Sequence, residues 1–222
     1  MNLLRSYGRF ILLVLLASSL SVAADTEPRE SQDTGLDIIE QDRYGEILVA
    51  PGVDWSIYTN VQLERATVEF RENWARDLKR SDGTIIRERD EERIKSDLAD
   101  LLDEILTKEL FLKEDFTMTD GSGKDVMRVT PRITDLDIYA PDRVRNYIGG
   151  ALADSKGRMT VELDIYDSIS GELLATSWQY QEDPYKGYME EANSPNNRRA
   201  FRLMTLRWVS WLRDHIGIAK PE

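Results

Sequence analysis

At 222 residues the chain is long enough for one well-cored domain, and its 41% hydrophobic and 32% charged residues are ordinary for a globular protein. A formal net charge of −12 repels phosphate groups, which argues against nucleic acid as a partner and against loose attraction to anionic lipid. Because the chain has no cysteine, it cannot form disulfides, thiolate metal sites or a cysteine nucleophile.

The N-terminus has the layout of a secretory signal peptide. Arg5 and Arg9 precede an apolar run over residues 10–20, and the small residues that follow allow cleavage after Ala23 or Ala24. The apolar run is shorter than the roughly 20 residues that a membrane-spanning helix needs. We therefore expect a protein that is soluble in the periplasm or secreted, without stable membrane insertion after cleavage.

The mature chain is predicted to begin with a flexible leader, because residues 24–45 are largely polar and acidic with little apolar periodicity. Further along, the apolar residues of segment 61–70 predict a strand. Their phase changes between Leu63 and Ala66, so a bulge is expected there.

A charged loop over residues 77–84 is predicted to lead into the first helix. Asp90 can cap this helix, and leucines and isoleucines at helical spacing carry it to about Phe111. The acidic residues of the helix then face outward. We interpret them as a solvated surface rather than a binding site.

The clearest structural signal is a β-hairpin over residues 156–181. Four apolar residues alternate with polar ones in its first strand, which is typical of a strand with one buried face: Met159, Val161, Leu163 and Ile165. A polar break follows, in which Gly171 can supply the left-handed conformation that the chain reversal needs.

Two further elements flank the hairpin. Segment 126–139 predicts a strand, in which Pro131 is expected at an edge or bulge position because proline has no backbone N–H. Ser194 followed by Pro195 predicts the start of a helix that ends at Gly217.

The predicted element order is therefore strand, helix, three strands and helix. Neighbouring strands without an intervening helix favour an antiparallel or mixed sheet. We predict a single α+β domain over residues 46–217, with a sheet of about four strands and both helices on one face. The signal peptide would occupy residues 1–23 and the leader residues 24–45.

Candidate catalytic residues are few. His215 is the only histidine, and its place near the end of the last helix favours packing or capping over catalysis. Asp135 and Asp137, expected on one strand face, could form a metal-dependent or carboxylate-based hydrolase site if they converged with Asp164. A solvated strand face is the simpler interpretation, and we predict no catalytic residue, metal or cofactor.

Aromatic residues suggest a third hypothesis, a small-molecule carrier with a pocket beneath Trp178. The residues that could stack on a ligand are Trp178, Tyr180, Tyr185 and Tyr188. Packing within the core and the hairpin is the interpretation that we favour for them.

Segment 140–155 is the least regular part of the domain, and long irregular loops are often functional. If the protein contacts a partner, we expect this loop to take part. The residues of the predicted contact region are Arg143, Arg145, Tyr147, Gly149 and Gly150.

Several turns carry a family resemblance that covers most of residues 47–216. The motif residues are Pro51, Gly52, Val53, Asp54, Trp55, Ser56 and Tyr58, the Gly149-Gly150 pair, and Asp167, Ser170, Gly171 and Glu172. They resemble a bacterial envelope family known as domain of unknown function 3313, whose members are usually described as lipoproteins. The resemblance implies no catalytic residues. The chain departs from the family pattern in lacking a cysteine for lipid attachment, and in Ser170, where the family has threonine.

These observations together predict a non-catalytic, soluble periplasmic accessory or binding protein with an envelope protein as its partner. The hydrolase and the small-molecule carrier stay open as alternatives.

Overall fold

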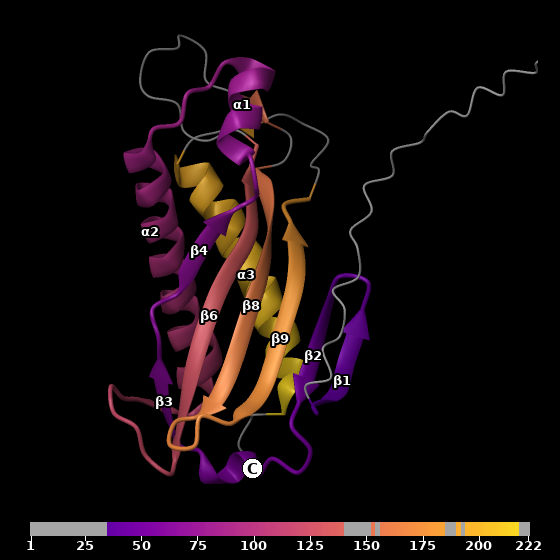
Figure 1. The fold of residues 1–222 in the computed structure, drawn as a ribbon, viewed down its shortest axis with the longest axis vertical. Coiled ribbons are helices and arrows are strands. Elements are labelled where there is room, and N and C mark those ends of the chain that lie inside the picture. Colours follow the sequence, from indigo (N-terminus) through magenta and orange to yellow (C-terminus); the bar gives the residue numbers. More distant parts are fainter. Residues whose placement is uncertain (1–34, 140–151, 154–155, 185–189, 192–193, 218–222) are drawn as a thin grey trace, which may run out of the picture. The chain divides into compact units, whose positions relative to one another are not determined.

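The computed structural model describes residues 35–139, 152–153, 156–184, 190–191 and 194–217, all within one structural unit that begins at Gly35. Most strands join one mixed sheet in the order β1-β2-β9-β8-β6-β3-β5, in which β4 also pairs with β6 (Figure 1). The strands are β1 Asp37–Asp42, β2 Gly45–Val49, β3 Asn60–Leu63, β4 Thr67–Phe70, β5 Thr117–Met118, β6 Val126–Ile138, β8 Gly157–Asp167 and β9 Leu173–Glu182. A separate pair joins β7 (Leu152–Ala153) to β10 (Glu190–Glu191).

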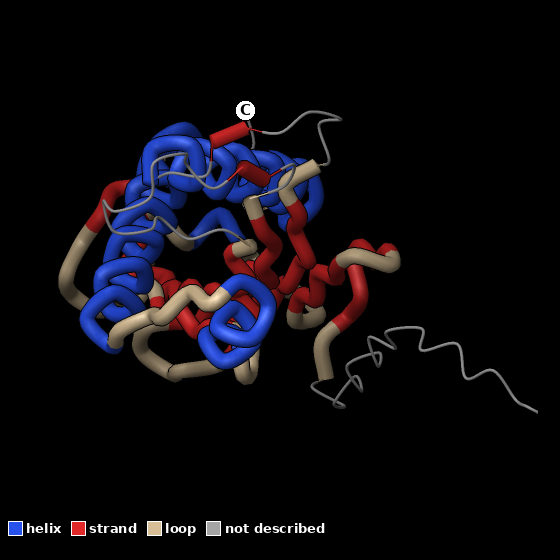
Figure 2. The backbone as a smooth tube through the Cα atoms, turned by 90° about the horizontal axis from the view of Figure 1, so that it is seen from above, coloured by secondary structure: helices blue, strands red, loops and turns tan. Residues whose placement is uncertain are grey.

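The two long helices lie on the same face of the sheet, as a second layer beside the strands (Figures 1 and 2). The helices are α1 Trp74–Asp82, α2 Glu88–Ile105 and α3 Ser194–Ile216, and α2 continues as a π-helix over Leu106–Phe111. Short 3-10 turns occupy Trp55–Ile57 and Leu112–Glu114. The prediction of an α+β domain is confirmed, with more strands than expected and a third helix, α1, among the described residues.

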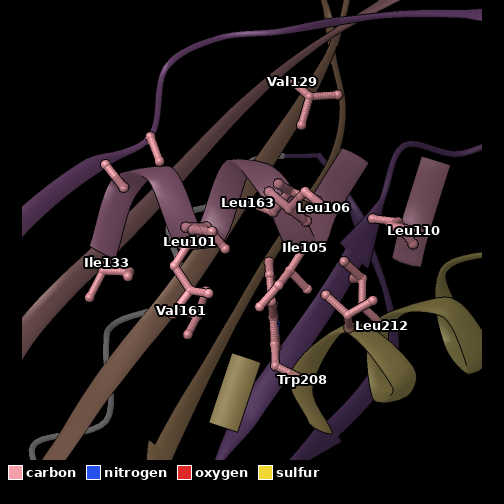
Figure 3. Close-up of a cluster of buried hydrophobic side chains, with 14 of the residues drawn as sticks. Leu101, Ile105, Leu106, Leu110, Val129, Ile133, Val161, Leu163, Trp208 and Leu212 are labelled. Atoms are coloured by element: carbon pink, nitrogen blue, oxygen red, sulfur yellow. The ribbon is translucent and has the colours of Figure 1, made fainter. Parts of the chain in front are cut away.

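The core fills the space between the sheet and these helices (Figure 3). Leu101 and Ile105 of α2 point toward Val161 and Leu163 of β8, and Trp208 of α3 closes the cluster; all five are buried. The alternating apolar residues of β8 and the three- and four-residue spacing of the helices therefore face one another, as their periods require.

The hairpin prediction is confirmed, because β8 and β9 pair as antiparallel neighbours on either side of a tight turn. Asp167 begins that turn, and its carboxylate accepts hydrogen bonds from the backbone N–H groups of Ile169 (3.0 Å) and Ser170 (2.7 Å). Gly171 has φ +73°, the left-handed conformation expected of it.

Pro131 lies opposite a gap in the neighbouring edge of the sheet. The carbonyl of Val129 points toward β3, since it accepts a hydrogen bond from the Glu64 backbone N–H (2.9 Å). Backbone directions alternate along a strand, so the Pro131 nitrogen faces the same side. There β3 has ended at Leu63 and β4 begins only at Thr67. The missing N–H therefore falls where no strand pairs, which is why proline is tolerated inside β6.

Two predicted irregular segments are regular in the structure. The segment predicted as a charged loop over 77–84 is largely helical, as part of α1, because Trp74 and Leu78, one helical turn apart, are both buried. Residues 37–42, predicted to belong to the flexible leader, form β1, which is held by its ladder with β2 although its side chains are mostly exposed. Neither element has enough apolar residues for periodicity to reveal it.

Candidate functional site

The face of the sheet that points away from α2 and α3 is the most distinctive surface of the described residues, and we call it the open face. Figure 1 looks onto it, and strands β6, β8 and β9 run there without a helix in front of them below α1. Its side chains alternate with those of the core, and neighbouring strands bring them into rows. In one row Arg132 stands opposite Glu162, Glu162 opposite Trp178, and Trp178 opposite Glu46.

Over β6 and β8 the open face is a network of paired charges. The Arg132 guanidinium donates to Glu162 (3.1 Å) and reaches Asp164 at 2.8 Å. Thr134 donates to Glu162 (3.0 Å) and Thr176 donates to Asp164 (2.6 Å). Glu162 is only 4% exposed and Asp164 only 8%, so both of these bonded carboxylates are buried. Burial alone would lower the pKa of Arg132, but the bonds to Asp164 and Glu162 outweigh it and raise that pKa.

Similar pairs extend this network toward both ends of β6. Arg128 pairs with Glu64 (3.0 Å), and its guanidinium lies 4.4 Å from the centre of the Tyr166 ring, a cation–π contact. At the other end, Asp137 accepts hydrogen bonds from Arg71 (3.0 Å) and Arg158 (3.1 Å). The charges of the face are therefore largely satisfied by one another.

The three carboxylates proposed for a hydrolase do not converge. Asp137 stands opposite Arg158 of β8, and Arg158 lies six residues from Asp164 along that strand. At about 3.3 Å per residue, this places Asp137 and Asp164 roughly 20 Å apart along the sheet. Asp135 has φ +51° at an irregularity of β6, where the register shifts, so the strict alternation that predicted a shared face with Asp137 does not hold there. The interpretation as a solvated strand face is also wrong for Asp137 and Asp164, which are buried and paired with arginines.

Toward β1 the open face becomes aromatic and aliphatic, and we call this part the aromatic end. Its residues are Ile38, Tyr44, Leu48, Trp178 and Tyr180. The Tyr44 and Tyr180 rings stack with their centres 6.5 Å apart. Trp178 is only partly buried, on the side of the sheet away from the helices, and not in the core as we expected. Among the described residues no aromatic ring stacks on its indole, while Tyr185 and Tyr188 lie outside them.

Two of the motifs that carry the family resemblance, those around Tyr58 and Asp167, meet at the end of the sheet where β6 begins. The Tyr58 hydroxyl donates to Asp167 across 3.0 Å, and the hydroxyl of Ser168 bonds to the Gly123 backbone. Burial, and then the bond to Asp167, raises the pKa of Tyr58 to about 12. The pKa of Asp167 is lowered by the hydrogen bonds that its carboxylate accepts, of which the bond from the Ser170 backbone N–H has the largest effect. These motifs therefore brace the turns against one another.

The raised pKa of Tyr58 predicts a loss of stability at alkaline pH. An unfolded tyrosine ionises near pH 10, whereas folded Tyr58 stays neutral to about pH 12, so only the unfolded state gains charge in between. The free energy of unfolding should fall as pH rises through this window, and less steeply in Tyr58→Phe, as measured by urea titration. The Asp167→Asn variant should keep part of the effect, because burial remains. Parallel curves for Tyr58→Phe and the parent protein would contradict this assignment.

The predicted contact residues Arg143, Arg145, Tyr147, Gly149 and Gly150 lie outside the described residues, so that region stays a prediction. His215 bonds through Nδ1 to the Trp211 carbonyl (2.7 Å), and its Nε2 is 3.9 Å from Glu40 of β1. It thus links the last turn of α3 to the edge of the sheet.

Two chemical features are absent from the part of the chain that the structure covers. No cluster of three or more histidine, aspartate or glutamate side chains there could hold a metal ion. None of the helices described above is long and apolar enough to cross a membrane.

Comparisons with known proteins give a family and weak structural likenesses. No curated protein matches the chain in sequence. A substituted form of the PelC dodecamer from Paraburkholderia phytofirmans is 8% identical, with a TM-score of 0.39 over 76% of this chain and 97% of that one. A minor lipoprotein from Acinetobacter baumannii is 14% identical, with a TM-score of 0.28 over 72% of this chain and 93% of that one. Structural similarities this weak do not bear on function. The sequence model of the family described as "Protein of unknown function (DUF3313)" matches residues 40–190, and the chain therefore belongs to this family.

Proposed function

We propose that the protein is a non-catalytic binding or accessory protein of the cell envelope. The observation that carries this proposal is the open face, whose buried carboxylates are already bonded to arginines and whose aromatic end is partly exposed. Charges that are paired within the protein hold a face rigid without leaving a reactive group. Partly exposed aromatic side chains on such a face are typical of binding surfaces.

The location in the envelope is supported by the N-terminal sequence. Arg5 and Arg9, the apolar run over 10–20 and the small residues up to Ala24 form the pattern of an exported protein. We expect mass spectrometry of a periplasmic extract to identify a chain that starts at Ala24 or Asp25. An intact N-terminus in the membrane fraction, or the whole chain in the cytoplasm, would contradict it.

The binding role is tested by photo-crosslinking in intact cells. A photoreactive amino acid placed at Trp178 should give a discrete adduct in the envelope fraction, which an excess of the unmodified protein should displace. Leu203 on α3 is the matched control, since it is 49% exposed but lies on a helix of the other layer. The proposal fails if position 178 gives no adduct, or if position 203 gives the same one.

A further inference from the structure

We infer that the free edge of β1 is a docking site for an extended segment of a partner protein that carries basic and apolar side chains. This inference rests on the proposed binding role and specifies the partner's chemistry. An exposed edge strand presents unpaired backbone N–H and C=O groups, to which an extended segment can add as a further strand.

The position of β1 in the sheet supports strand addition. β1 is the terminal strand, and within the described residues it pairs only with β2. Ile38 is 53% exposed and Ile39 51% exposed, so two large apolar residues of one short strand are open to solvent. Tyr44, in the turn that follows, is 41% exposed. Exposed apolar residues gathered in one hairpin indicate a contact surface more strongly than residues scattered singly.

The edge is also held in place, which lowers the entropy lost on binding. β1 keeps its ladder with β2 from Asp37 to Asp42, with one irregularity around Ile39. From the helix layer, His215 approaches Glu40. Ile38 lies opposite Leu48 and so continues the aromatic end of the open face. An added strand would extend that same surface.

Charge complementarity identifies the occupant as basic. Three carboxylates lie on β1, whose six residues include no cation: Asp37, Glu40 and Asp42. A symmetric antiparallel pairing of the whole of β1 with that of a second copy would place Asp37 opposite the partner's Asp42 at both ends, where like charges repel. A segment that alternates basic and apolar residues meets the carboxylates and the isoleucines at once.

The test uses the full protein and a fluorescent ten-residue peptide of alternating lysine and valine. Fluorescence anisotropy should show binding, and hydrogen exchange should show protection of the β1 amides. The same peptide with alternate amides N-methylated cannot complete the ladder and should bind at least about tenfold more weakly, a change of about 1.4 kcal/mol. A glutamate–valine peptide should not bind.

The variant Asp37→Lys/Ile39→Lys should weaken binding of the lysine–valine peptide by at least about tenfold. The control Ile85→Lys changes an isoleucine that is 72% exposed on another segment and should bind like the parent protein. Equal binding of the N-methylated peptide, no binding, or unchanged binding by the edge variant would each overturn the inference. So would a dimer that the edge variant dissociates, because the occupant would then be a second copy. Peptide binding by the purified protein does not depend on where the protein resides in the cell. A negative result in the peptide assay is therefore distinguishable from a failure of the proposed envelope location.

Discussion

Replacing Gly157 with alanine should destabilise the protein by about 3–5 kcal/mol, enough to prevent folding of a marginally stable domain. Gly157 has φ +147°, a conformation that L-residues rarely adopt. A Cβ atom there would lie 2.2 Å from the Asp137 carbonyl oxygen and 3.1 Å from the Ile138 Cα, both backbone atoms. Neither neighbour can move easily, because β6 lies inside the sheet and Asp183 donates its backbone N–H to the Gly157 carbonyl (3.0 Å).

A matched control separates this close approach from the cost of the glycine conformation itself. Gly171 also has positive φ, at +73°, but no atom lies within 4 Å of its hypothetical Cβ. The Gly171→Ala variant should therefore cost only about 1–2 kcal/mol, from the left-handed backbone alone. Urea unfolding of both variants at 25 °C measures the difference. If both variants lose the same free energy of unfolding, the backbone of β6 does not approach Gly157 closely enough to exclude a Cβ atom.

The contrast between these glycines shows what the sequence could and could not predict. Gly171 stands in a polar break between two apolar runs, so its role follows from local pattern. The requirement at Gly157 arises from Asp137 and Ile138, about twenty residues earlier in the chain, and no local pattern reports that approach. The same holds for β1, whose side chains are mostly exposed and whose order comes from pairing with β2.

The burial of charges on the open face differs from the predicted solvated strand face for a related physical reason. Glu162 and Asp164 alternate with core residues, and a charged residue in that pattern normally faces water. The residue that pairs with both of them, Arg132, comes from the adjacent strand β6, in a register that local alternation does not determine. The sequence predicts that the motif residues Tyr58 and Asp167 lie in or beside turns, but their direct bond depends on how the turns meet in three dimensions.

The second large effect is expected at Arg132, where methionine should lower the free energy of unfolding by about 2–4 kcal/mol. Removing one partner of a buried ion pair usually costs about 3–5 kcal/mol, because the other charge is left without compensation. Here two carboxylates would lose their bonds to Arg132, but the Arg132 side chain is 33% exposed, so solvent screening reduces the loss. Thr134 and Thr176 would still donate to them, which limits the loss further.

Neutralising the two carboxylates that bond to Arg132 should recover most of that stability. Adding Glu162→Gln and Asp164→Asn to Arg132→Met removes both charges, while each amide oxygen can still accept the threonine hydrogen bond that the carboxylate accepts now. Urea unfolding of the parent protein, the single variant and the triple variant gives the comparison. If the triple variant is as unstable as Arg132→Met, shape and packing at position 132 matter more than charge. If the triple variant regains its stability, the charges of the network stabilise the open face by pairing with one another. Partner recognition is then expected at the exposed aromatic end and at the edge of β1.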